Sequence, residues 1–145
     1  MGKKLKVLFL CTGNSCRSQM AEGWAKTLKN DAIEPYSAGT EPKTIDPRAV
    51  RVMREAGVDI SAHRPKSIDE FAGMRFDCVV TVCDRANEAC PIFPGAAERI
   101  HKSFDDPPKL AAAARTEDEA LSHYRRVRDE IRDFVANLRC TPRAE

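Results

Sequence analysis

Eight consecutive residues, Cys-Thr-Gly-Asn-Ser-Cys-Arg-Ser from Cys11 to Ser18, combine a nucleophile with the parts of an anion-binding loop. A cysteine reacts as its thiolate, which a nearby positive charge or a helix N-terminus favours. Arg17 adds a planar, permanently charged guanidinium that suits two oxygens of a tetrahedral oxyanion. Gly13 gives the backbone the conformational freedom that a tight loop requires. The stretch therefore predicts that Cys11 attacks a bound oxyanion.

A buried strand and a helix are expected on either side of this loop. The mostly apolar run Leu5–Leu10 predicts the strand, and the following pattern predicts a helix from Ser18 to about Lys29. A loop between a strand and a helix can turn its N–H groups inward, and the helix N-terminus adds partial positive charge. The residues expected to bind the oxyanion are Thr12, Gly13, Asn14, Ser15, Cys16, Arg17 and Ser18.

An alternative interpretation makes Cys11 a buried structural thiol and Arg17 a surface charge. A lone cysteine would favour that interpretation, because buried free cysteines are common. Here a cysteine, a glycine, an asparagine, an arginine and a serine coincide at one strand-to-helix junction. This coincidence favours a reactive cysteine.

The rest of the chain alternates predicted strands with predicted helices. Strands are expected at Ile33–Ala38, Asp77–Val82 and, with a weaker pattern, Arg99–Ser103. Helices are expected from Asp46 to a stop at Gly57, for a short stretch after Ser67, and from Thr116 to about Arg139. The segment Asp105–Ala114 is interpreted as a loop or a frayed helix start.

This alternation is typical of an α/β fold with a parallel sheet and right-handed crossovers. We expect a single domain over residues 1–145, because no linker, repeat or low-complexity segment divides the chain. Ligands of such sheets bind at the carboxyl ends of the strands, where Cys11 falls. Met20, Trp24 and Leu28 recur at helical spacing, and we expect them to face the core.

The charge balance gives no reason to expect nucleic acid or membrane partners. The chain has 24 basic and 22 acidic residues, for a net charge of +2. The arginines near the C-terminus are interleaved with acids, as on a solvated helix face. No apolar run approaches the roughly 20 residues of a membrane span, and no signal-peptide core precedes Cys11. We therefore expect a cytoplasmic protein.

Six cysteines and three histidines are present, but they show no zinc-binding spacing such as Cys-x2-Cys. Cys83 follows a predicted buried strand, so it should share a sheet edge with Cys11. Cys90 follows across a polar segment that spans about 20 Å when extended, so a Cys83–Cys90 disulfide requires that segment to loop or unwind. The residues alone leave open whether this pair is redox-active or a pair of passive small hydrophobes.

The Cys-x5-Arg spacing and the run Val7–Glu22 resemble the low-molecular-weight protein tyrosine phosphatase superfamily. Within it, Ser15–Trp24 is most similar to the thioredoxin-coupled arsenate reductases. The resemblance covers nearly the whole chain and implies a four-stranded parallel sheet flanked by helices.

The same resemblance implies redox roles for two further cysteines. Thioredoxin-coupled arsenate reductases carry a second and a third redox cysteine in segments similar to Val79–Asp84 and Ala89–Ile92, which assigns these roles to Cys83 and Cys90. It also implies thioredoxin as the reductant and no cofactor, because the thiols carry the electrons. No catalytic role is expected for the remaining cysteines, although Cys16 lies close enough in sequence to form a protective disulfide with Cys11.

An acid is expected in the sequence Phe-Asp-Asp-Pro that ends at Pro107. In the family that the chain resembles, the aspartate directly before the proline is the general acid, which corresponds to Asp106. Adjacent acids before a proline also form ordinary solvated turns. Phosphatases that act on phosphotyrosine usually follow Asp-Pro with a tyrosine, but here Pro108 and Lys109 follow. An aromatic wall for the substrate is therefore missing.

Together these features predict reduction of arsenate to arsenite. Cys11 attacks arsenic, Asp106 protonates the departing oxygen, and the oxidising equivalent passes to Cys83 and then to Cys90. Ser18 is expected to hold the thiolate and Asn14 to support the loop. One alternative is a phosphomonoester hydrolase that uses Cys11, Arg17 and Asp106; a second is a non-enzymatic oxyanion-binding module.

Some proteins that the chain resembles hold a potassium ion behind the loop. The corresponding oxygen groups here belong to Asn14, Glu22 and Ser37, whereas Lys66 occupies the position of a further acid. An ammonium group at this place can replace the cation, so we predict no bound metal.

Overall fold

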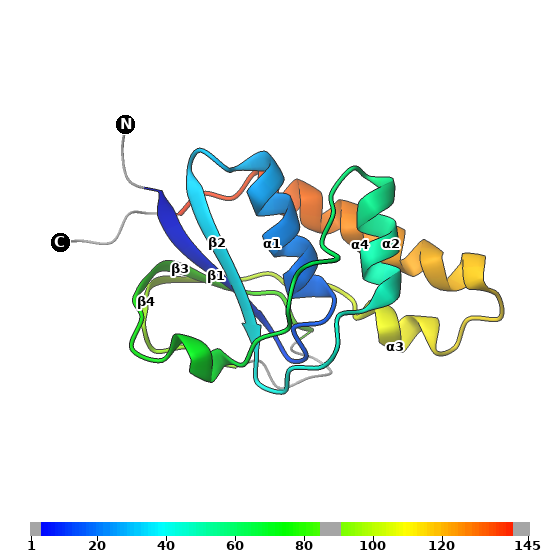
Figure 1. Cartoon of the computed structure of the whole chain (residues 1–145), viewed down its shortest axis with the longest axis horizontal. Coiled ribbons are helices and arrows are strands. Elements are labelled where there is room, and N and C mark those ends of the chain that lie inside the picture. The colour runs from blue at the N-terminus through cyan, green and yellow to red at the C-terminus, as the bar shows by residue number, and fades with distance from the viewer. Residues whose placement is uncertain (1–3, 85–90, 141–145) are drawn as a thin grey trace.

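A computed structural model describes residues 4–84 and 91–140. In it, four parallel strands form one sheet that positions the Cys11–Ser18 loop. The strands are β1 (Leu5–Cys11), β2 (Ile33–Gly39), β3 (Phe76–Thr81) and β4 (Ala96–His101). Their order in the sheet is β2-β1-β3-β4, so the strand that ends in Cys11 is central. The predicted α/β class with a four-stranded parallel sheet and flanking helices is confirmed (Figure 1).

Local capping explains where most of the helices begin. The helices are α1 (Arg17–Leu28), α2 (Pro47–Glu55), α3 (Pro107–Ala111) and α4 (Glu117–Ala136), and a short 3-10 helix, η1, spans Ile68–Phe71. The Asp46 carboxylate accepts a hydrogen bond from the backbone N–H of Arg48, and the Thr116 hydroxyl accepts one from that of Glu119. Ser67 starts η1 with a complete capping box, as its sequence predicted.

Several predicted boundaries were wrong. The last strand begins at Ala96 rather than Arg99, because β4 lies at the sheet edge and its half-buried residues give a weak apolar pattern. Of the two alternatives for Asp105–Ala114, a loop or a frayed helix start, the structure has a short helix, α3, and α4 ends at Ala136 rather than at about Arg139. Leu28 is 42% exposed rather than in the core, since it is the last residue of α1.

The sheet is buried on both faces. Val7, Phe9 and Cys11 of β1 pack in one cluster with residues of α1, α2 and α4. Leu8 and Leu10 point to the other face, into a smaller cluster. This two-sided burial explains why β1 is a continuous apolar run rather than an alternating one. No helix among the described residues has the length and apolar character needed to cross a membrane.

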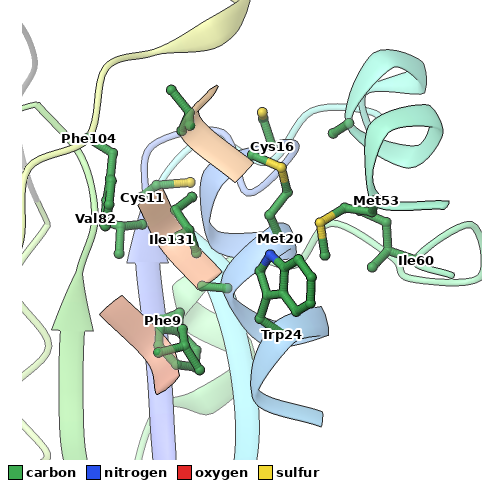
Figure 2. Close-up of a cluster of buried hydrophobic side chains, with 14 of the residues drawn as sticks. Phe9, Cys11, Cys16, Met20, Trp24, Met53, Ile60, Val82, Phe104 and Ile131 are labelled. Atoms are coloured by element: carbon green, nitrogen blue, oxygen red, sulfur yellow. The ribbon is translucent and has the colours of Figure 1, made fainter. Parts of the chain in front are cut away.

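The helix α1, which follows the loop, is held very close to its neighbours. Trp24 is buried as predicted, and its indole N–H donates to the Arg128 carbonyl at 3.2 Å. Figure 2 shows Trp24 and Met20 beside Met53 and Ile60. A Cβ built on Gly23 would lie 2.7 Å from Cγ2 of Ile60, so only glycine permits this approach.

We expect Gly23→Ala to destabilise the fold by about 1–3 kcal/mol through overpacking against Ile60. At an ordinary helix position the same change stabilises by up to about 1 kcal/mol, so the sign of the effect is informative. Urea unfolding of Gly23→Ala measures it, and Ser122→Ala on the exposed face of α4 is the control. A Gly23→Ala variant as stable as the parent would contradict the close approach.

Candidate active site

The loop after β1 is shaped by hydrogen bonds to the segment between β2 and α2. The carbonyls of Thr12, Gly13 and Ser15 each accept a 3.0 Å bond from a backbone N–H of that segment. All described peptide bonds are trans, so the N–H on each peptide plane points opposite to its carbonyl. Outward-bonded carbonyls therefore turn the partner N–H groups to the other side of the loop, as anion binding requires.

Asn14 stabilises the Cys11–Ser18 loop through its side-chain hydrogen bonds. It is fully buried and has a positive φ of 48°, a conformation that asparagine tolerates better than most residues. Its Oδ1 accepts hydrogen bonds from Gln19 Nε2 at 3.0 Å and from the Lys66 backbone N–H at 2.8 Å. Its Nδ2 donates to Ser18 Oγ at 2.7 Å. The structure thus ties Asn14 to the hydroxyl predicted to hold the nucleophile.

Cys11 Sγ lies 2.9 Å from Ser18 Oγ. Since Ser18 Oγ already accepts a hydrogen bond from Asn14, its own hydrogen is available to Cys11. Cys11 is 3% exposed at the end of β1, and α1 begins at Arg17. A hydroxyl donor and a helix N-terminus both stabilise a thiolate over a thiol.

Arg17 is 4% exposed, and its position is fixed by the segment before α3. Its Nη1 donates to the Phe104 carbonyl at 3.1 Å, and its Nη2 lies 3.7 Å from Asp106 Oδ1. The neighbouring Asp105 is instead paired with Arg126 at 2.9 Å. Of the two adjacent acids, Asp106 is therefore the one beside the guanidinium.

A cavity of about 510 Å³ joins these groups. Cys11, Arg17 and Asp106 all line it, together with Thr12, Gly13, Ser15 and Cys16. Sequence reasoning missed other lining residues, among them Thr40, Glu41, Lys43, Asp84, Lys109 and Leu110. The first three follow the carboxyl end of β2, so parallel topology itself could have indicated them. No aromatic side chain of the described residues lines the cavity.

A larger hollow of about 710 Å³ lies elsewhere, between η1 and residues 92–97. Among the described residues, neither a cysteine nor a residue of the Cys11–Ser18 loop lines it. We assign the site to the smaller cavity, because there the described residues bring together a cysteine, a fixed guanidinium and a carboxylate.

Cys83 lies at the same sheet edge as Cys11. The Val82 N–H donates to the Leu10 carbonyl at 2.9 Å, which extends the pairing of β3 with β1 up to Cys83. Cys83 is fully buried and belongs to the same core cluster as Cys11. It is disulfide-bonded, whereas Cys11 is a free thiol. Cys90, the third predicted redox cysteine, lies outside the described residues.

Cys16 is close to Cys11, the predicted nucleophile, but differs from it chemically. It is 3% exposed and carries a free thiol. Burial, followed by the charge of Asp46, raises the pKa of Cys16 well above the ordinary value. A thiol that keeps its proton is a poor nucleophile, so Cys16 does not compete with Cys11.

Lys66 lies where the sequence comparison placed it, next to Glu22 behind the loop. Its Nζ is 3.7 Å from Glu22 Oε1, and Lys26 Nζ is 2.8 Å from Oε2. The Ser37 hydroxyl also donates to Glu22. Burial opposes ionisation of Glu22, but the hydrogen bonds from Lys26 and Ser37 outweigh it and lower the pKa of Glu22. Two lysines therefore compensate this buried carboxylate.

This arrangement makes the stability contribution of Glu22 dependent on pH. Its folded-state pKa is lowered, so the contribution is present above the unfolded carboxyl pKa of about 4.3 and is lost as pH falls through the folded value. We expect Glu22→Gln to lower the free energy of unfolding most near neutral pH, with the deficit shrinking below about pH 4. Urea unfolding at a series of pH values measures this, with Asp31→Asn, an exposed carboxylate, as the control. A deficit that does not change with pH would refute the ionic role.

Residues 6–141 match the low molecular weight phosphotyrosine protein phosphatase family. The chain belongs to this family. It is 49% identical over 131 residues to an arsenate reductase of Halalkalibacterium halodurans, covering 90% of this chain and 91% of the relative. The resemblance found in the sequence is therefore confirmed.

Solved structures agree with this assignment. An arsenate reductase in the phosphate-binding state is 33% identical with a TM-score of 0.77, and the match covers 93% of this chain and 95% of the other. The thioredoxin-dependent arsenate reductase of Corynebacterium glutamicum is 25% identical with a TM-score of 0.64, and the match covers 92% of this chain and 61% of the other.

Proposed function

We propose that this protein reduces arsenate to arsenite by a thiol–disulfide cascade from Cys11 through Cys83 to Cys90. The observation that carries the proposal is that Cys11, whose Sγ lies 2.9 Å from Ser18 Oγ, lines one cavity together with Arg17 and Asp106. The arsenate reductases to which the chain is similar support the choice of substrate.

Arsenate binding uses the same features that bind phosphate. Both oxyanions are tetrahedral and negatively charged, so the loop N–H groups and the Arg17 guanidinium suit either one. The related structure in the phosphate-binding state supports this view. The Phe104 carbonyl already accepts a hydrogen bond from Arg17 Nη1. Arg17 therefore loses little further side-chain entropy when it binds an oxyanion.

The first chemical step forms a bond between Cys11 sulfur and arsenic. The thiolate attacks arsenic, and an arsenate oxygen leaves as water after Asp106 gives it a proton. Asp106 stands at the N-cap position of α3, directly before Pro107; its side chain makes no capping hydrogen bond and is 33% exposed. This position lets it exchange protons with solvent between turnovers.

The second step transfers two electrons to arsenic. The Cys83 thiolate attacks Cys11 sulfur, a Cys11–Cys83 disulfide forms, and the sulfur–arsenic bond breaks with its electron pair going to arsenic, which leaves as arsenite. Cys90 then attacks Cys83, forms a Cys83–Cys90 disulfide and releases Cys11 as a thiolate. The free thiol at Cys11 and the disulfide at Cys83 are compatible with the state that follows this exchange.

A dithiol protein must then reduce the disulfide, and we assign this role to thioredoxin. The thioredoxin-dependent relative from Corynebacterium glutamicum supports the assignment. The thiols must start each cycle reduced, which fits the cytoplasm, where such a reductant is maintained. The cascade needs no cofactor, because the sulfurs carry both electrons.

The alternative of a phosphomonoester hydrolase uses the same cavity. Cys11, Arg17 and Asp106 would suffice for it, and weak phosphatase activity is expected from either function. The cavity lining favours the reductase, because among the described residues no aromatic ring is available to pack against phosphotyrosine. The placement of Cys83 beside the carboxyl end of β1 also has no use in simple hydrolysis.

Cys83→Ser separates these functions. We expect it to abolish multiple-turnover arsenite formation with thioredoxin, thioredoxin reductase and NADPH, while hydrolysis of p-nitrophenyl phosphate by Cys11 stays close to the parent rate. Arsenite is measured directly, and Cys11→Ser, which should lose both activities, is the matched control. Unimpaired arsenate turnover in Cys83→Ser would exclude the cascade. A parent protein that binds phosphate but neither hydrolyses esters nor reacts with arsenate would support the non-enzymatic alternative.

The two adjacent acids allow a matched test of the proton donor. We expect Asp106→Asn to slow the first step, measured as single-turnover formation of the Cys11 adduct, by about 10²–10⁴-fold. Asp105→Asn removes an equal charge one residue away but leaves the neighbour of Arg17 intact, so its effect should be much smaller. Equal losses in the two variants would show that general charge, rather than a placed acid, supports the reaction.

A further inference from the structure

Cys78, Glu98 and Cys140 form a cluster that the proposed reaction does not use. One sulfur from each cysteine and one carboxylate oxygen of Glu98 all lie within 4.8 Å of one another. Cys78 of β3 pairs in register with Glu98 of β4 and, on its other side, with Val7 of β1. Val7 precedes Cys11 by about 13 Å along the strand. The cluster therefore lies toward the amino ends of the strands, away from the active site at their carboxyl ends.

The fold brings this cluster together from three separate elements. Cys140 follows α4, and the chain there returns to the beginning of the sheet, near the start of β1 (Figure 1). Leu138 is buried in the core, which holds the end of the segment in place, and Cys140 packs partly buried against the same core. Because the two cysteines are distant in sequence, no metal-binding spacing could have revealed them.

Two carboxylates, those of Glu98 and Asp77, act on the thiols of the cluster. The Cys78 and Cys140 thiols share a hydrogen bond. Glu98 and Asp77 both oppose the formation of thiolates. Asp77 also accepts a hydrogen bond from the Lys6 backbone N–H at 2.8 Å. A cation at this place would replace the shared thiol proton and relieve the repulsion.

We propose that Cys78, Glu98 and Cys140 bind a thiophilic divalent cation such as Zn²⁺ or Cd²⁺. Two thiolates select soft and borderline metals over Mg²⁺ and Ca²⁺, and three protein ligands leave a fourth position for water. Two metal–sulfur bonds and one metal–oxygen bond form, the thiol protons pass to the solvent, and no electrons are transferred.

Cd²⁺ titration of the reduced full-length chain tests the site through the ultraviolet thiolate-to-cadmium charge-transfer band. Replacing Cys11, Cys83 and Cys90 by serine removes competing thiols, and a phosphine reductant avoids added ones. In this background we expect one Cd²⁺ per chain. Cys140→Ser should abolish the band, and Glu98→Gln, which keeps both thiols, should weaken binding by roughly tenfold or more.

Cys16→Ser is the matched control, since it removes another buried free thiol and should leave the band unchanged. A band that persists in Cys140→Ser, or that is lost in Cys16→Ser, would overturn the proposal, as would no band at all. Thermal unfolding of the parent gives an independent readout, because a cation that binds only the folded chain raises Tm. Zn²⁺ should raise Tm in the parent and much less in Glu98→Gln; equal shifts would also overturn the site.

Discussion

The site depends on the hydrogen bonds that Asn14 makes behind the loop. Its side chain is completely buried, and it binds the Ser18 hydroxyl on one side and the Lys66 backbone on the other. These hydrogen bonds offset the conformational free energy that the left-handed backbone of Asn14 costs. Because Ser18 Oγ accepts from Asn14, the Ser18 hydroxyl can donate its hydrogen to Cys11. A buried polar group with all its partners in place is rigid, because any displacement leaves a donor or an acceptor unsatisfied. Cys11, the proposed nucleophile, is thus oriented before any substrate binds.

The second constraint is electrostatic and links Arg17 to Asp106. At 3.7 Å, Arg17 Nη2 and Asp106 Oδ1 form an ion pair in which the guanidinium lies beside the carboxylate. An anion bound in the cavity would lie next to the Asp106 carboxylate, and two like charges repel each other. Under the proposed function, substrate binding itself therefore helps to load the acid with the proton that the leaving oxygen needs. Asp105 cannot take this role, because Arg126 holds it.

Local patterns were sufficient to predict the loop and much of the fold. The spacing of Cys11 and Arg17, the caps at Asp46, Ser67 and Thr116, and the core position of Trp24 each depend on residues near one another in sequence. What sequence reasoning missed depends on packing between distant elements. The edge strand β4 lacks a two-sided apolar pattern, and Leu28 has core spacing but extends beyond its neighbours. Glu41 and Lys43 border the cavity only because β2 lies next to β1.

The cysteines show how one small fold can keep chemically similar groups in separate roles. Cys11 is buried yet has a hydroxyl donor at 2.9 Å, whereas burial of Cys16 next to the charge of Asp46 stabilises its protonated form. Cys78 is buried toward the amino ends of the same strands, where the carboxylates of Glu98 and Asp77 act on it. A reactive thiolate needs positive charge or hydrogen-bond donors nearby, whereas a bound cation needs negatively charged ligands. The surroundings of Cys11 suit a thiolate, and those of Cys78 suit a cation. Parallel strands enforce the separation, because a register fixed along β1 and β3 holds Cys78 at the level of Val7 and away from Cys11.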